Sequence, residues 1–234
     1  MINFKNLKSG FTLAEVLITL GIIGVVAAMT LPTLIANYQK NQVISQLKKA
    51  YSTLAQAFTM ATTEYESPEG WDISGLDSYG FIQKYLYPYL NIAKDCGTET
   101  TGNCEFKVSK LNSDTYENFG STHPRFYLND GTLIALKIFN QDNQVWTNIY
   151  IDVNGNKNPN KYGKDIFMYN ILFKTSNTNL IGKFLPVGAG LTRAEIISNS
   201  KYGCSKNVSG TNAGTYCSAL IMTDGWHMAK DYPW

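Results

Sequence analysis

The segment from Asp152 to Asp165 has the composition of a loop that could bind a hard cation. Its sequence, DVNGNKNPNKYGKD, places oxygen-bearing side chains on alternate residues, as calcium requires. The spacing begins like an EF-hand loop, but Lys157 stands where that loop needs glycine and its final glutamate is missing, which excludes an EF-hand. Asp152, Asn154 and Asp165 are the candidate calcium ligands. A loop rich in Asn, Gly and Pro is more often a plain turn, and both interpretations stay open.

Four cysteines form two local pairs, Cys96 with Cys104 and Cys204 with Cys217. Neither pair has the two-residue spacing of a zinc knuckle, and the chain has only two histidines to add as ligands. Paired cysteines behind an export-like N-terminus indicate disulfides and an oxidising compartment. Free thiols or a metal site are the alternatives, and four cysteines allow three pairings.

Glu15 is the only charge in an apolar run, residues 11–31, that is long enough to cross a bilayer. A carboxylate in hydrocarbon costs about 3 kcal/mol, so an intramembrane acid indicates a function. Lys5 and Lys8 precede the run and should stay in the cytoplasm, which places the rest of the chain on the far side. A secretory signal peptide cut near residues 26–28 is the alternative, but a disposable segment does not require this carboxylate.

The residues around Glu15 resemble a known motif. The string KSGFTLAEVL, residues 8–17, is similar to the prepilin cleavage and methylation motif of type IV pilins and type II secretion pseudopilins. In that family a membrane peptidase cuts after the glycine and methylates the new N-terminal residue. The resemblance extends to about Ile35 and implies cleavage between Gly10 and Phe11, N-methylation of Phe11 and a role for Glu15 in assembly.

The physical chemistry of Glu15 agrees with this role. Cleavage would expose an α-amine that is cationic near neutral pH, and the amine of an incoming subunit can pair with Glu15 of a neighbour. An unpaired buried charge is penalised and a paired one is tolerated, which favours the addition of subunits in register. Snorkelling of Glu15 to the lipid headgroups is the alternative. Pro32 lies where family pilins have a matching proline, and a proline inside a helix commonly kinks it.

Two periodicities predict the elements that carry these residues. Apolar side chains recur every three or four residues from Val43 to Tyr65, which predicts a helix with one stripe packed on a sheet, ended by residues 67–70. A short helix interrupted near Pro88 is expected over residues 79–93, and another short helix after Thr192. Period-two segments predict antiparallel strands, with a hairpin turn at residues 129–131. The strands are 125–129, 132–139, 145–153 and 165–173.

The predicted fold is α+β and pilin-like, with a long N-terminal transmembrane-plus-amphipathic helix packed on a small antiparallel β-sheet head. The expected organisation is a prepilin leader, the transmembrane part of the stem helix, its amphipathic part and a globular head. Their ranges are 1–10, 11–35, 36–66 and 67–234.

Charge and motifs limit the function. The net charge of +2 comes from Lys5 and Lys8, and the neutral remainder offers no electrostatic surface for nucleic acid. No nucleophile elbow, P-loop or zinc-protease motif occurs, so we expect no enzyme. The resemblance implies a structural subunit, a pseudopilin or minor pilin of a type II secretion-like or type IV pilus-like filament. It needs no cofactor, except for the possible calcium ion.

The same resemblance implies a location and partners. The protein is expected in the bacterial inner membrane as a single-pass protein with an extracytoplasmic head. Its expected partners are other pilin or pseudopilin subunits, prepilin peptidase, an inner-membrane assembly platform and the lipid bilayer. The alternative is a membrane-anchored or exported binding protein or enzyme with a calcium-stabilised head. Secretion, adhesion, motility and DNA uptake are not separated by the sequence.

Overall fold

The computed structural model describes residues 10–73, 75–176 and 178–234. The chain divides into two compact units between Gln42 and Val43. Lys5 and Lys8, the basic residues of the predicted leader, lie outside the described residues.

The N-terminal unit contains the first part of helix α1 (Leu13–Tyr65). Thr12 begins the helix, because its hydroxyl accepts a hydrogen bond from the Glu15 amide at 3.2 Å and the Glu15 carboxylate accepts one from the Thr12 amide at 2.8 Å. These reciprocal bonds make a capping box. The helix continues through Pro32. Within the described residues, α1 is the one helix that is long and apolar enough to cross a membrane.

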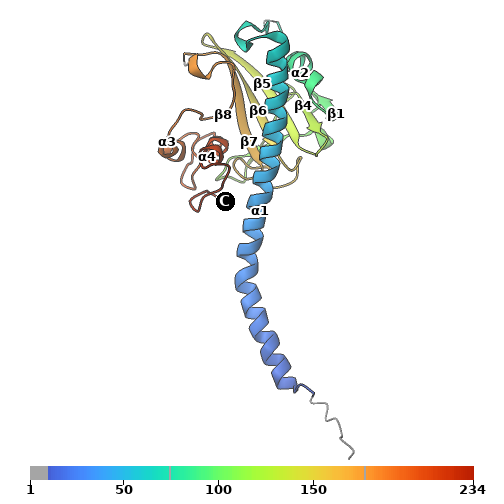
Figure 1. The fold of residues 1–234 in the computed structure, drawn as a ribbon, viewed down its shortest axis with the longest axis vertical. Helices are drawn as coiled ribbons and strands as arrows, with labels where there is room; N and C mark the ends of the chain where they lie inside the picture. The colour runs from blue at the N-terminus through green and yellow to red at the C-terminus, as the bar shows by residue number, and fades with distance from the viewer. Residues whose placement is uncertain (1–9, 74, 177) are drawn as a thin grey trace, which may run out of the picture. The chain divides into compact units, whose positions relative to one another are not determined.

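The C-terminal unit is built on a six-stranded antiparallel sheet with the order β1-β4-β5-β6-β7-β8 (Figure 1). The strands β4 to β7 form a meander, and β1 and β8 pair with its two edges. The bounds are β1 (Ile92–Gly97), β4 (Arg125–Leu128), β5 (Leu133–Gln141), β6 (Gln144–Asp152), β7 (Ile166–Lys174) and β8 (Phe184–Pro186). The four predicted strands correspond to β4, β5, β6 and β7, each shifted by one or two residues.

Two tight turns set the register of the meander. The predicted turn at residues 129–131 joins β4 to β5, with Gly131 at a φ of 87° and the Asp130 carboxylate accepting from the Thr132 amide at 3.1 Å. The turn between β5 and β6 consists of Asp142 and Asn143, whose φ values are 51° and 64°. Asp and Asn tolerate this left-handed region, which a two-residue hairpin turn requires.

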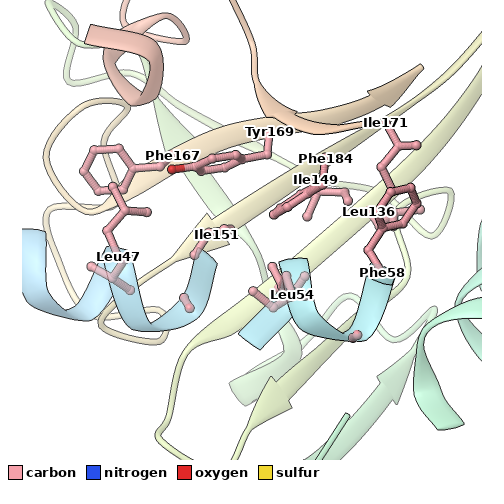
Figure 2. Packing of buried hydrophobic residues seen from close by; sticks show 14 of the residues in the cluster. Leu47, Leu54, Phe58, Leu136, Ile149, Ile151, Phe167, Tyr169, Ile171 and Phe184 are labelled. Atoms are coloured by element: carbon pink, nitrogen blue, oxygen red, sulfur yellow. The ribbon is translucent and has the colours of Figure 1, made fainter. Parts of the chain in front are cut away.

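Helix α1 covers one face of the sheet, which we call the helix face (Figure 2). Every second strand residue points to this face, as the period of two requires. The predicted stripe supplies the helix side, and Ala50 and Ala57, both fully buried, allow a close approach of the backbone. The packed side chains include Leu47, Leu54 and Phe58 from α1 and Leu136, Ile149, Ile151, Phe167, Tyr169 and Ile171 from the sheet.

The opposite face, here the hairpin face, is covered by a small two-stranded sheet of β2 (Lys107–Ser109) and β3 (Tyr116–Asn118). Phe106 and Val108 are buried against Leu133, Ala135, Tyr150, Ile166 and Met168. Strands of three residues are too short to show a period, so the sequence did not reveal this layer.

The prediction of a helix over residues 79–93 is wrong in its second half. Helix α2 (Ser78–Tyr85) is followed by a 3₁₀ turn at Tyr87–Tyr89, which contains Pro88. Strand β1 then begins at Ile92, because its backbone pairs with β4. Tertiary pairing thus overrides a local helical pattern.

The remaining helices lie near the ends of the head. Another 3₁₀ turn, η1 (Pro68–Gly70), follows α1 at the predicted stop. The predicted helix after Thr192 is α3 (Arg193–Ser198), and Thr192 caps it with Glu195 in a capping box. Helix α4 (Cys217–Thr223) was not predicted.

Candidate functional site

The predicted processing site lies just before α1. Gly10, Phe11 and Thr12 are outside the helix, and the Phe11 side chain is 88% exposed. The bond between Gly10 and Phe11 is therefore in exposed backbone outside the helix, where a peptidase can reach it. The cut itself stays a prediction.

The side chain of Glu15 points back toward this site because it caps the N-terminus of α1. Its Oε2 accepts hydrogen bonds from both the amide and the hydroxyl of Thr12, each at 2.8 Å. The carboxylate thus lies within one residue of the position where cleavage would expose the amine of Phe11. Sequence reasoning missed Thr12, although a threonine three residues before a glutamate is a capping signature that could have identified it. The assembly roles of Glu15 and Pro32 stay predictions.

Both local cysteine pairs form disulfides, Cys96 with Cys104 and Cys204 with Cys217. All four cysteines are buried, and none is free. The second disulfide packs against the 152–165 loop: a Cβ on Gly163, whose φ is 77°, would lie 2.6 Å from the Cys217 sulfur. Only glycine fits there, because both the backbone conformation and the space exclude a side chain.

The 152–165 loop brings its three predicted ligands together. Asp152 and Asp165 are each 1% exposed. Asp152 accepts from the backbone amides of Asn154, Gly155 and Asn156 at 2.8–3.2 Å. The Asn154 side chain donates to Asp165 at 3.1 Å and links the two carboxylates.

Asp165 closes the other end of the loop. It accepts from the amides of Asn160 at 2.8 Å and Lys161 at 2.6 Å. Asn160 is 3% exposed, and its side-chain amide, oriented to suit its neighbours, donates to Asp152 at 3.2 Å and to the Lys157 carbonyl at 3.0 Å. Asn160 is a loop residue that sequence reasoning did not select among its many asparagines.

The two buried carboxylates have no cationic partner within the described residues. Lys161, whose backbone amide donates to Asp165, instead pairs through its side chain with Asp114 at 2.8 Å. Burial raises the pKa of Asp152 to about 7, and the nearby Asp165 charge adds to this rise. Burial also raises the pKa of Asp165. A proton or a cation would relieve the repulsion between them.

The oxygens available for calcium are limited. Calcium takes six to eight oxygen ligands, but every carboxylate oxygen of Asp152 and Asp165 already accepts an N–H. The Asn154 amide oxygen is buried without a partner. Within the described residues, no group of three His, Cys, Asp or Glu side chains is placed to hold a metal. This donor set is that of a hydrogen-bonded loop with one spare oxygen, and calcium binding stays a prediction.

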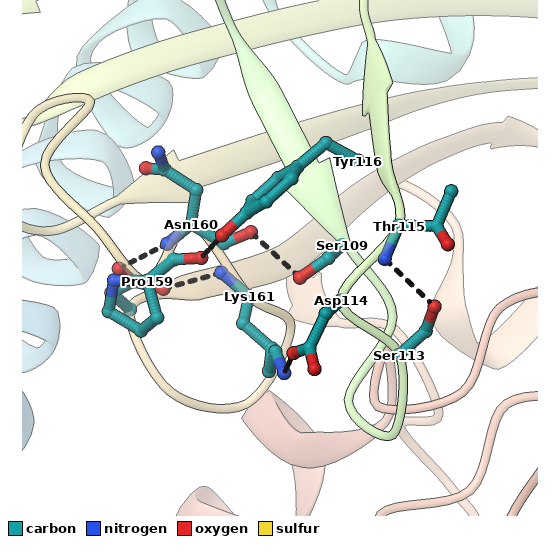
Figure 3. Close-up of polar contacts among 9 residues, drawn as sticks. Ser109, Ser113, Asp114, Thr115, Tyr116, Pro159, Asn160 and Lys161 are labelled. Atoms are coloured by element: carbon teal, nitrogen blue, oxygen red, sulfur yellow. Dashed lines mark hydrogen bonds and ion pairs between the residues drawn. The ribbon is translucent and has the colours of Figure 1, made fainter.

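The loop also fastens the β2–β3 layer (Figure 3). Ser109 donates to the Asn160 carbonyl through its amide at 2.8 Å and through its hydroxyl at 3.4 Å. The hydroxyl bond is drawn in Figure 3, as is the bond from the Tyr116 hydroxyl to the Pro159 carbonyl at 3.0 Å. The ion pair of Lys161 with Asp114 adds a third link. On another side, the buried Tyr232 hydroxyl donates to the Gly163 carbonyl at 2.6 Å and holds the C-terminal segment. The loop is therefore a structural junction.

Arg125 fastens the same layer from the sheet. It is fully buried, and its guanidinium donates to the carbonyls of Cys104, Phe119, Gly120 and His123 at 2.7–3.1 Å. These carbonyls lie at both ends of the excursion that carries β2 and β3. Sequence reasoning missed Arg125, because a single arginine in a strand pattern gives no sign of burial.

Two matches to protein families accord with this geometry. The prokaryotic N-terminal methylation motif matches residues 5–31, and a family of unknown function (DUF6613) matches residues 33–234. No curated protein and no solved structure matches the chain. The first match confirms the resemblance to pilin-like proteins that prepilin peptidases process, and the long helix on an antiparallel sheet confirms the α+β fold. The chain is thus a type IV pilin-like protein that belongs, over residues 33–234, to the DUF6613 family.

Proposed function

We propose that the protein is a structural subunit, a pseudopilin or minor pilin, of a type II secretion-like or type IV pilus-like filament. The observation that carries this proposal is the start of α1: an accessible Gly10–Phe11 bond followed by an apolar run, residues 11–31, whose only charge is Glu15. The side chains of this segment are exposed, at 60% for Leu20 and 63% for Ile23. They need lipid or the helices of neighbouring subunits to cover them.

Pairing of Glu15 with a neighbouring subunit sets the register in which the subunits assemble. In the single chain its carboxylate is held by Thr12. The amine of a processed neighbour can take the place of these donors and form a charge-assisted bond, which is stronger than a neutral one in a low dielectric. Addition in register is then favoured over slipped arrangements.

The surroundings of the two histidines in the head favour a structural role over a catalytic one. Within the described residues, His123 is stacked on Phe119 at 4.3 Å and burial lowers the pKa of its imidazole to about 4, while His227 is exposed on the C-terminal segment. No serine or cysteine is hydrogen-bonded to either ring in that part of the chain. This arrangement supports a non-enzymatic subunit.

The two disulfides support a head outside the cytoplasm, because disulfides persist in oxidising compartments. The protein then sits in the inner membrane by α1, with prepilin peptidase and an assembly platform as its partners there. Other pilin-like subunits are its partners in the filament.

A calcium ion at the 152–165 loop is a separate proposal. It rests on two buried carboxylates without a basic partner and on the spare oxygen of Asn154. Calcium would neutralise the carboxylate pair, with Asp152, Asn154, Asp165 and Asn160 as the residues that hold it.

Mass spectrometry of the protein purified from its native membrane tests the main proposal. We expect a chain that begins at N-methyl-Phe11, and a Gly10→Val variant that retains its leader. A wild-type chain that begins at Met29, or that retains Met1, would overturn the proposal and favour an exported or anchored binding protein.

A further inference from the structure

The β2–β3 layer covers only part of the hairpin face. It buries the hairpin-face residues at the start of β5 and β7 and at the end of β6, such as Ala135 and Tyr150. Further along the same strands the hairpin-face residues are half-buried, as Asn170 on β7 shows beside the buried Ile171 of the helix face. We call this part of the sheet the open face. Its residues are Lys137, Phe139, Trp146, Asn148, Asn170 and Leu172.

The open face is arranged in rows across the sheet, because β5, β6 and β7 pair in register. An apolar row lies between two rows that carry amide side chains. Neighbouring strands are about 4.8 Å apart, so the apolar row is about 10 Å long over the three strands. The first row is Lys137, Asn148 and Asn170, the apolar row is Phe139, Trp146 and Leu172, and the third row is Gln141 and Gln144.

The apolar row is fixed in place by its aromatic pair. The rings of Phe139 and Trp146 are stacked, with centroids 5.2 Å apart and planes 7° apart. The Lys137 ammonium lies over the Phe139 ring at 5.0 Å. Such a cross-strand pair stabilises a hairpin by itself. Both rings are only half-buried, however, so part of the stack stays accessible to a ligand.

The amide rows have hydrogen-bonding capacity that the fold does not use. The side chains of Gln141, Gln144 and Asn170 form no hydrogen bond within the described residues. Each amide offers two N–H donors and one carbonyl acceptor. An apolar surface laid on this face would remove their bonds to water without replacing them, which is costly. A ligand rich in hydroxyl groups replaces those bonds.

The open face carries little charge. Lys137 is its one formal charge, and its rows contain no Asp or Glu. Lys174, two residues after Leu172, is bonded to the Asn143 side chain at 3.0 Å. A polyanion is held by several cations at once. The charge of this face is therefore matched to a neutral ligand.

We propose that the open face binds a neutral carbohydrate chain. A sugar ring presents C–H bonds on its flat sides, and these pack on aromatic rings because the electron-rich ring faces attract the hydrogens. Its hydroxyl groups lie around the rim, where amide side chains can donate and accept. An apolar row with amides on both sides has the same distribution of groups, and its length matches a disaccharide unit.

Saturation-transfer NMR with the full chain in lauryldimethylamine oxide micelles tests the site, because this detergent has no sugar headgroup to compete. The probes are cellotetraose and chitotetraose, neutral tetrasaccharides of glucose and of N-acetylglucosamine. We expect saturation of the ring C–H protons of at least one probe. Half-saturation should fall in the millimolar range, since a shallow site buries little of the ligand.

Three variants locate the binding. Trp146→Ala removes the centre of the apolar row and should weaken binding at least about tenfold. Gln144→Ala with Asn170→Ala keeps the aromatic stack and should weaken it about fivefold. Tyr38→Ala removes an aromatic side chain that is 68% exposed on α1 and should leave binding unchanged. The amide variant keeps the test valid if loss of Trp146 disturbs the hairpin, which near-UV circular dichroism reports.

The outcomes are decisive for the site. No saturation of either probe, or equal saturation with wild type and both open-face variants, overturns the proposal. A dimer of the full chain that Trp146→Ala dissociates and neither probe displaces would assign the open face to a second copy, and also overturns it.

This inference is independent of the proposed function. A chain that begins at N-methyl-Phe11 but binds no sugar loses the carbohydrate site alone. A chain that retains Met1 and binds sugar through Trp146 loses the proposed function alone.

Discussion

The two faces of the sheet are held by different physical means. The helix face is a continuous apolar core in which a long helix and the strands β4 to β8 bury aliphatic and aromatic side chains. The hairpin face buries fewer side chains and depends on Arg125, on the 152–165 loop and on single hydrogen bonds to carbonyls. Burial of apolar area is insensitive to pH and ions, whereas buried polar groups are stable only while every partner is present. The helix face should therefore set global stability, and the hairpin face should respond to conditions.

The largest effect is expected on the helix face. Phe58→Ala removes a side chain that is 6% exposed and lies tilted against Trp71, with ring centroids 5.6 Å apart. It should lower the free energy of unfolding of the full chain in detergent by about 4 kcal/mol, measured by denaturant titration. Met60→Ala on the same helix, at a side chain 55% exposed, is the control and should change it by less than about 0.5 kcal/mol. Equal losses would remove the distinction between buried and exposed helix positions.

Arg125→Met should damage the hairpin face while sparing the helix face. It leaves four carbonyl acceptors without their donor, at a cost of about 3 kcal/mol. Hydrogen exchange should show faster exchange at residues 105–124 and native protection in α1 from Leu47 to Ala61. If protection is lost equally from both regions, the two faces form one cooperative unit and the comparison fails.

Calcium should act on the hairpin face alone. If the loop binds it, millimolar calcium should raise the free energy of unfolding of the wild type by about 2 kcal/mol, since a ligand stabilises the state that it binds. Asp165→Asn keeps the shape of the side chain, removes one charge and should show no such gain. Magnesium is the control ion, because it favours fewer protein ligands and a rigid octahedral site. An equal response of wild type and variant would leave the loop as a hydrogen-bonded turn only.

The smallest effect is a pH dependence from His123. Burial, with Lys137 and Arg125 nearby, lowers the pKa of its imidazole from 6.5 to about 4. The folded protein thus prefers neutral His123, so this stability is fully present above pH 6.5 and is lost as the pH falls toward 4. We expect a loss of about 1 kcal/mol, reduced from the full linkage value because the ring is partly exposed to solvent.

His123→Phe isolates this contribution, because the buried aspartates titrate in both proteins. The difference in unfolding free energy between wild type and variant should be constant above pH 7 and should change between pH 6.5 and 4. A difference that stays constant over the whole range would show that the ring is free to ionise in the folded state.

Prediction from sequence succeeded where a pattern is local and repeated. The stripe from Val43 to Tyr65 and the strands of the meander depend on periodicity, which any helix or strand with one buried face must show. The turn at residues 129–131 depends on backbone freedom at Gly131. Prediction from sequence failed in the second half of residues 79–93, where strand β1 forms only because β4 lies beside it.

The same contrast between local pattern and tertiary contact applies to the residues of the candidate sites. Asp152, Asn154 and Asp165 were selected by composition and do lie together, but the sequence did not reveal that their oxygens are already bonded to backbone amides. Arg125 and Asn160 were missed, because burial of a polar residue depends on what surrounds it. No local signal carries that information.

The sequence by itself determined the motif at Gly10, Phe11 and Glu15, the helix that carries it and the α+β class, because each depends on residues close together in the chain. Only the tertiary structure decided the β2–β3 layer and the junction at the 152–165 loop. These depend on contacts between segments that are tens of residues apart. Their formation requires the whole sheet to be in place, because long loops must be closed before such contacts are gained.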